Sequence, residues 1–290
     1  MKTNTICLLS VFLASQLLYG CSFARLTVTA SMPMIEGGFI ALNRETDLIL
    51  AEAAMPANIE LIEGMLINAP DNIKLRLYAS QAYYGYSYGF VEDNNKVRAS
   101  NLYYRGFKHG ISALKYHGLN EDLLTLPLDS LQSFVSNLDN NATASLFWTA
   151  SCLAKWVDMN RDKPESIAQM SRANILMQRV LELDENFFMG GAKLFFAVYY
   201  GSKPPILGGD YQKSEHYFSM ARSFNSDKLL LVDLLQAQYL DRQLLNRKQF
   251  ITRLNKILET PDNIYPDQSL LNMIAKRKAT LFLKKESTWF

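Results

Sequence analysis

Histidine and cysteine, the side chains that most often hold metals or act as nucleophiles, are scarce in this sequence and poorly placed for either role. None of the three histidines, His109, His117 and His216, has a partner at a metal-ligand spacing, and no pair of cysteines accompanies them. Cys152 lies in an apolar helical run, which predicts a buried and inert thiol. We therefore expect no metal site and no cofactor.

Two glutamate–serine pairs are the remaining candidates for catalysis, because lytic transglycosylases, which are built on helical superstructures, use such a pair. Glu165-Ser166 lies in an ordinary first helical turn, and Glu286-Ser287 lies four residues from the end of the sequence. We interpret both pairs as surface residues and predict that the protein is not an enzyme. A glycan-processing enzyme on a helical superstructure stays open as an alternative.

The first twenty residues are typical of a lipoprotein export signal. Lys2 is their only charge, an apolar run follows, and the segment leads into Leu18-Tyr19-Gly20-Cys21, which resembles a lipobox. The run is too short to be a comfortable membrane-spanning helix. We predict a signal peptide over residues 1–20, acylation of Cys21, with palmitate among the lipids expected, and a lipidated tether over residues 21–38. The protein is then a periplasmic lipoprotein on a bacterial membrane; an ordinary secretory signal is the alternative.

The charge balance limits the partners. Thirty Lys and Arg residues stand against 28 Asp and Glu residues, a formal net charge of +2. This excludes the dense positive field that nucleic-acid binding requires. We interpret the basic run Lys276-Arg277-Lys278 as a solvated helix face, with contact to a membrane surface as the alternative.

Small and aromatic residues recur at fixed offsets, as in the second helix of a tetratricopeptide unit, where small residues let two helices approach and the aromatic fills the groove. The hydrophobic period is helical nearly everywhere from Arg44 onward. The recognisable copies, the last of them degenerate, are Ser214, Phe218 and Ala221; Ala173, Met177 and Val180; Ala99, Tyr103 and Gly106; and Ile62 and Met65 before Pro70.

These copies predict an all-α fold with a single domain over residues 39–290. Repeat units cannot bury their apolar faces alone, so we expect tetratricopeptide-like hairpins stacked into a curved array with a concave groove or a central pore. Between the copies, His117 to Leu131 reads as a long loop that ends in a helix N-cap at Asp129 or Ser130. An irregular helical bundle is the alternative.

Aromatic side chains, many of them tyrosines, gather in a few helices and are our candidates for the wall of a ligand cavity. A buried tyrosine hydroxyl needs a partner, so an apolar core would use Phe or Leu instead, whereas a partly wet wall suits tyrosine. Ordinary core packing is the alternative for all of them. The candidates are Tyr83, Tyr84, Tyr86, Tyr88, Phe90, Tyr103, Tyr104, Phe107, Phe147, Trp148 and Trp156.

The chain resembles the T-component lipoproteins of tripartite ATP-independent periplasmic (TRAP) transporters, the tetratricopeptide-containing partners of the solute-binding subunit. With the lipobox, the motifs that carry the resemblance span nearly all of the mature chain. They are Ile62 through Pro70, Ala79 through Glu92, Tyr104-Arg105-Gly106, Trp148 with Trp156, and Pro205 through Asp210 before Tyr217-Phe218. Ser214 departs from the repeat, which prefers alanine there.

The resemblance implies a function that composition does not. A member of this family is expected to be a homo-oligomer, a trimer, that docks the periplasmic solute-binding protein and binds or passes a hydrophobic ligand. The family has no catalytic motif to carry over. A lipidated repeat scaffold for outer-membrane protein assembly is the alternative function.

Overall fold

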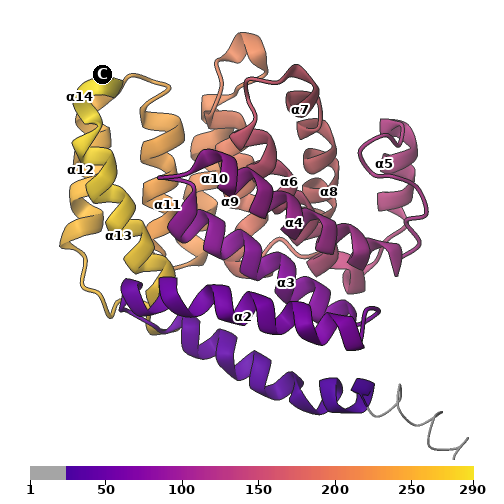
Figure 1. The fold of residues 1–290 in the computed structure, drawn as a ribbon. Helices are drawn as coiled ribbons and strands as arrows, with labels where there is room; N and C mark the ends of the chain where they lie inside the picture. Colours follow the sequence, from indigo (N-terminus) through magenta and orange to yellow (C-terminus); the bar gives the residue numbers. More distant parts are fainter. Residues whose placement is uncertain (1–23) are drawn as a thin grey trace, which may run out of the picture.

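The structure, a computed structural model, describes residues 24–290, and every regular element in that range is a helix. The predicted all-α class is therefore confirmed (Figure 1). The signal peptide and Cys21 lie outside the described residues. After a first helix over residues 24–43, the elements are α2 (Leu48–Asn68), α3 (Ile73–Tyr86), η1 (Ser87–Val91), α4 (Lys96–Lys115), α5 (Leu128–Ser136), η2 (Asn140–Ala142), α6 (Thr143–Met159), α7 (Pro164–Ala168), α8 (Met170–Leu183), α9 (Phe187–Gly201), η3 (Pro205–Leu207), α10 (Tyr211–Phe224), α11 (Leu230–Leu235), η4 (Gln236–Asp241), α12 (Arg247–Glu259), η5 (Pro266–Gln268), α13 (Ser269–Lys284) and α14 (Glu286–Trp289).

Asparagine and aspartate side chains fix where several of these helices begin. Asp47 accepts hydrogen bonds from the first amides of α2, Asn72 from that of Leu75 in α3, and Asp210 from that of Lys213 in α10. Each side chain satisfies an amide that has no partner inside its own helix, which is worth about 1 kcal/mol per cap.

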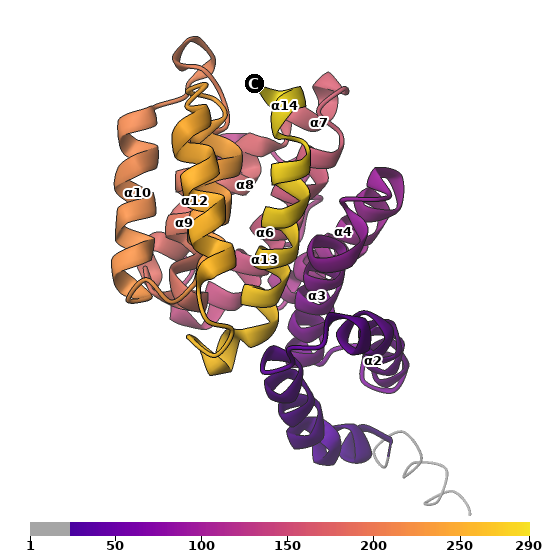
Figure 2. The same cartoon turned by 90° about the vertical axis from the view of Figure 1, so that its left-hand side faces the viewer.

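Successive helices pack as pairs joined by short connections. α3 packs on α4, α6 on α8, α9 on α10, and α11 with η4 on α12. Neighbouring pairs are in contact as well, since α4 packs on α6 and α8 on α9. Figure 2 shows α9, α10 and α12 as upright neighbours on one side of the molecule, with α3 and α4 on the other.

The second helix of three pairs carries the small and aromatic residues that the sequence singled out, and they are buried. On α10, Ser214, Phe218 and Ala221 have no exposed surface, and the copies on α8 and α4 are buried in the same way. A Cβ on Gly106 of α4 would lie 2.8 Å from the Sγ of Cys152 on α6. Small residues at these positions therefore permit the close approach of the helices.

The last long helix returns to the beginning of the domain. α13 packs on α11 and α12, and it also contacts α2, so that its lower end lies beside the N-terminal helices in Figure 1. Leu270 and Ile274 of α13 belong to the core that α2 and α3 build. The helices thus surround an interior space, to which every pair contributes.

Two local features differ from expectation. The expected tether is helical over residues 24–38, where Val28 and Met32 are buried against the core of α2 and α3. α5 begins at Leu128 with Pro127 as its cap, slightly before the predicted start. The loop that precedes α5 is well packed: Arg172 donates to the carbonyls of Leu123 and Leu126, both at 2.7 Å.

The basic run on α13 is not a solvated face, and the expectation was wrong for Lys278. Its side chain is 1% exposed, and its Nζ lies 2.9 Å from both Glu92 Oε1 and Asp93 Oδ2. Charged side chains are seldom buried unless they are paired, and here the partners lie 186 and 185 residues away in the chain.

Candidate functional site

A large cavity lies in the interior of the described domain. Its volume is about 1050 Å³, and its walls are mostly apolar. The first helices of the four pairs provide one side: α3, α6, α9, and α11 with η4. The helix over residues 24–43, α2 and α13 close the other side, whereas no residue of α4, α10 or α12 lines the cavity. These three second helices therefore support the wall from behind, whereas the second helix α8 contributes Met170 and Ser171 to it.

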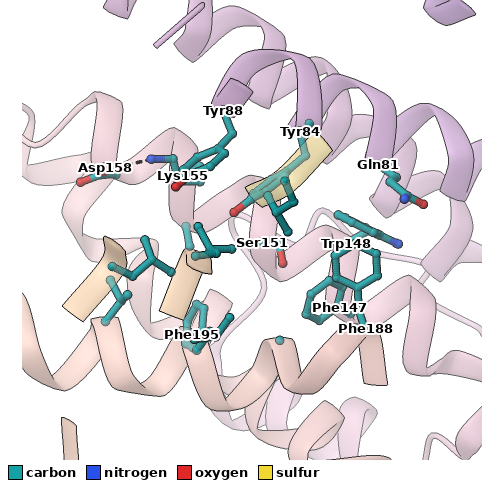
Figure 3. A pocket seen from close by; sticks show the side chains of 18 of the residues that line it. Gln81, Tyr84, Tyr88, Phe147, Trp148, Ser151, Lys155, Asp158, Phe188 and Phe195 are labelled. Atoms are coloured by element: carbon teal, nitrogen blue, oxygen red, sulfur yellow. Dashed lines mark hydrogen bonds and ion pairs between the residues drawn. The ribbon is translucent and has the colours of Figure 1, made fainter. Parts of the chain in front are cut away.

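Aromatic rings form one end of the cavity (Figure 3). Trp148 and Phe147 project from neighbouring positions on α6, with ring centroids 5.0 Å apart. The ring of Phe188, from the start of α9, lies 4.7 Å from Trp148 and 5.4 Å from Phe147. These rings are packed edge to face or tilted against one another, which is the arrangement that aromatic pairs prefer.

The backbone at this aromatic end is strained. Phe188 and Met189 have φ angles of 47° and 60°, and Gly190 continues the left-handed turn at 74°. Non-glycine residues rarely adopt this region, because the Cβ crowds the backbone. The next residue, Gly191, has no room for a Cβ, which would lie 2.6 Å from the ring of Phe147. Strain of this kind clusters at binding sites.

Polar and charged groups form the other end of the cavity. In Figure 3, Tyr88, Lys155 and Asp158 lie together, opposite the aromatic end. Lys155 Nζ lies 2.7 Å from Glu92 Oε2 and 3.3 Å from Asp158 Oδ2. Tyr239 donates its hydroxyl to the same Asp158 oxygen at 3.3 Å. This end therefore differs from the rest of the cavity in having hydrogen-bonding groups.

Tyr88 and Tyr239 both lie in π-helical segments, η1 and η4, which continue α3 and α11. A π-helical turn inserts an extra residue and shifts the direction of side chains, and such turns are frequent at functional sites. The hydroxyl of Tyr88 is buried and makes no hydrogen bond to the part of the chain that the structure describes. Burial raises its pKa well above the ordinary value, so the group is a neutral phenol.

The charged groups of the polar end stabilise one another in their ionised forms. Burial by itself would lower the pKa of Lys155, but Glu92, Tyr239 and Asp158 outweigh it, and the pKa is raised. Burial would raise the pKa of Asp158, but Lys155 and Arg161 lower it. Lys155 is therefore a permanent cation and Asp158 a permanent anion near neutral pH.

The structure divides the eleven aromatic candidates into two groups. Tyr84, Tyr88, Phe147 and Trp148 line the cavity. The other seven do not line it and pack in the helical cores: Tyr83, Tyr86, Phe90, Tyr103, Tyr104, Phe107 and Trp156. That the lining residues contact a ligand stays a prediction.

Tyrosines outside the wall find partners of their own. The hydroxyl of Tyr83 donates to Glu63 Oε1 at 2.6 Å, and that of Tyr103 donates to Glu92 Oε2 at 2.6 Å. The argument that a buried tyrosine implies a cavity therefore fails for these two residues, because acidic side chains outside their own helices accept hydrogen bonds from the two hydroxyls.

Five aromatic wall residues were not among the candidates: Phe39, Phe188, Phe195, Tyr199 and Tyr239. Phe195 and Tyr199 lie four residues apart on α9, with rings stacked at 6.2 Å, so their spacing marks one helix face. Tyr239 carries no such signal, since its direction depends on the π-helical segment.

The residues with catalytic potential lie elsewhere. Neither glutamate–serine pair lines the cavity. Within residues 24–290, no group of three or more His, Cys, Asp and Glu side chains is placed to hold a metal ion. His109 lies 3.2 Å from Glu63 Oε1, outside the cavity, and burial lowers its pKa.

Cys152 is buried on α6, and burial raises the pKa of its thiol to about 12. Only the thiolate is nucleophilic, so we expect the folded protein to react very slowly with a thiol reagent such as Ellman's reagent at pH 8, and quickly once guanidinium unfolds it. The rate of colour development in the two states measures the difference. Fast reaction of the folded protein would contradict the buried position of Cys152.

The described residues thus form a helical domain whose paired helices surround an apolar cavity. None of the helices within residues 24–290 is both long and apolar enough to cross a membrane. The chain matches the family described as TRAP transporter T-component over residues 44–290, and it belongs to that family. No curated protein matches it. The family is one of non-enzymatic transport proteins, and membership indicates a periplasmic or membrane-associated role in TRAP transport.

Proposed function

We propose that this protein is a lipid-anchored periplasmic subunit that docks the solute-binding protein of a TRAP transporter and binds a hydrophobic ligand in its cavity. The observation that carries the ligand part is the apolar cavity of about 1050 Å³. Ligand pockets ordinarily enclose about 300–1,000 Å³ and combine apolar walls with a few polar groups, as this one does.

Access from solvent supports the same proposal. Several residues that line the cavity are also exposed: Met34 and Leu61 on the N-terminal helices, Ile167 on α7 and Leu207 on η3. An apolar ligand could therefore enter without unfolding of the domain. The homo-oligomer, a trimer, is part of the proposal and rests on the family alone.

A variant that fills the cavity tests ligand binding. Ser151 projects from the middle of α6 into the cavity (Figure 3). We expect Ser151→Trp to abolish saturable uptake of the neutral dye Nile red, because the indole occupies the space, while the helical circular dichroism is kept. Ser133→Trp, on the exposed face of α5, is the matched control and should bind like the wild type. Equal dye binding by all three proteins would refute the ligand proposal.

Docking is tested separately, by native mass spectrometry of the delipidated protein with a candidate solute-binding subunit. A mixed complex supports docking, and the masses also give the oligomer number. If the protein forms no complex with any solute-binding subunit encoded beside it but does bind a barrel-assembly protein, the scaffold alternative is correct.

Lipid anchoring is tested at Cys21. We expect a fatty-acid probe to label the wild type and not Cys21→Ala, because the thiol is the acylation site of the lipobox. The variant should accumulate as an unlipidated precursor and keep its helical circular dichroism. Equal labelling of the two proteins would show that Cys21 is not the anchor.

A further inference from the structure

Among the described residues, the charged side chains that line the cavity are Lys155, Asp158, Arg161 and Lys203. Three are cations and one is an anion. The first three come from the end of α6 and the turn after it, and Lys203 follows the end of α9. The rest of the lining is apolar, aromatic or uncharged.

These four residues belong to the same end of the cavity. The starts of α6 and α9 meet where Phe147 contacts Gly191. Their ends are linked through η4: Tyr239 donates to Asp158 at the end of α6, and a Cβ on Gly201, the last residue of α9, would lie 3.5 Å from Leu240. The two helices therefore run parallel, and the charges gather where both of them end.

Lys203 is the cation that this arrangement leaves without a carboxylate. Asp158 lies 3.3 Å from Lys155 and 2.6 Å from Arg161, so it is shared by these two. Lys203 makes no ion pair with any residue from 24 to 290. Its Nζ lies 3.7 Å from the centroid of the Tyr199 ring, which also lines the cavity.

The loop after α9 holds Lys203 at this place. Gly209 donates its amide to the Pro204 carbonyl at 3.1 Å, and Asp210 donates to the Tyr200 carbonyl at 3.0 Å. A Cβ on Gly209 would lie 1.9 Å from the Lys203 carbonyl oxygen, so only glycine fits. The loop is therefore folded closely around Lys203 and limits the positions that the lysine can take.

From this geometry we infer that the cavity binds an amphiphile with one anionic head, that the head pairs with Lys203, and that the apolar body extends toward Trp148. The inference rests on the proposed ligand binding. An unpaired cation beside an apolar space favours an anion more strongly than one in bulk water, since the local dielectric is lower. Hydrogen bonds between ionised partners are also stronger than neutral ones.

The test compares three probes that share an alkyl chain and differ in the charge of the head: decanoate, 1-decanol and decyltrimethylammonium. Calorimetry, or displacement of Nile red, measures their affinities for the full delipidated protein. We expect the wild type to bind decanoate most tightly, with an affinity that falls as salt is added. Lys203→Met should weaken the affinity for decanoate by about tenfold or more and leave the affinity for 1-decanol unchanged. Lys203→Arg should restore decanoate binding.

Lys213→Met is the matched control. Lys213 also lies over a tyrosine ring, that of Tyr200 at 5.2 Å, but it pairs with Asp210 and does not line the cavity. The Lys213→Met variant should therefore bind decanoate like the wild type. Equal affinity of the wild type for decanoate and 1-decanol, or equal weakening of both by Lys203→Met, would overturn the anionic head while leaving ligand binding intact. Failure of every probe and of Nile red to bind would overturn both proposals.

Discussion

Replacing Glu92 by leucine is expected to destabilise the folded protein by about 3–5 kcal/mol, the usual cost of removing one member of a buried ionic group. The side chain of Glu92 is 8% exposed. It accepts from Lys155 at 2.7 Å, from Lys278 at 2.9 Å and from the Tyr103 hydroxyl at 2.6 Å. Leucine would leave two buried lysines short of counter-charge and one phenol without an acceptor. Unfolding in guanidinium, followed by circular dichroism, measures the change.

Two variants show whether the cause is the buried charge. Glu92→Gln keeps the shape of the side chain and an acceptor for the Tyr103 hydroxyl, so it should lower the free energy of unfolding less than Glu92→Leu does. Glu182→Leu removes a carboxylate that is 48% exposed and pairs with Arg179 on the surface, and it should change the free energy of unfolding by no more than about 0.5 kcal/mol. If Glu92→Leu unfolds at the same denaturant concentration as Glu182→Leu, the buried network does not stabilise the fold.

Acid provides an independent measurement on the same residue. Burial by itself would raise the pKa of Glu92, but Lys155 and Lys278 outweigh it, so the folded-state pKa lies below 4.5. A depressed carboxyl pKa contributes stability that is present above the unfolded-state pKa and is lost as the pH falls through the folded-state pKa. The wild type should therefore lose stability below about pH 4.5 more steeply than Glu92→Gln. Identical slopes would contradict the lowered pKa.

The helices were predictable from the sequence because their signals are local. The small residues of α4, α8 and α10 recur within one helical face, and each of the three sets is buried. Caps such as Asp47 and Asp210 lie next to the helices that they start. A reader of the sequence needs only a window of about one helix to find either signal.

The cavity wall was only partly predictable, because a wall and a core use the same apolar residues. Tyr83 and Tyr84 are adjacent, yet Tyr83 bonds to Glu63 and Tyr84 lines the cavity. The helical period predicts that they face different directions, but it does not say which direction is hollow. The hollow depends on how the pairs of helices are placed around it, which is not a local property.

Non-local pairing and unusual backbone account for the other differences. The sequence of α13 alone predicts an exposed Lys278, because its partner Asp93 lies 185 positions away in the chain. The directions of Tyr88 and Tyr239 depend on π-helical segments, which a period of 3.6 residues does not describe. Phe188 adopts a left-handed conformation that its residue type disfavours.

Ala221→Trp is expected to destabilise the fold by about 1–3 kcal/mol or more, because a closely packed site does not absorb an indole without strain. Ala221 has no exposed surface and belongs to the core that α10 shares with Leu194 and Ala197 of α9 and with Leu240 of η4. Forcing α9, α10 and η4 apart would also loosen the cavity wall, since α9 and η4 both line the cavity. The melting temperature, followed by circular dichroism, should fall.

The matched control is Ser219→Trp, which places the same side chain on the exposed face of α10. It should change the free energy of unfolding by no more than about 0.5 kcal/mol. Because both variants carry the same indole on the same helix, a difference between them reports the packing of α10 on its neighbours and not the helix propensity of tryptophan. An equal melting temperature for the two variants would mean that α10 does not pack through Ala221, and the pairing of α9 with α10 behind the cavity wall would then be wrong.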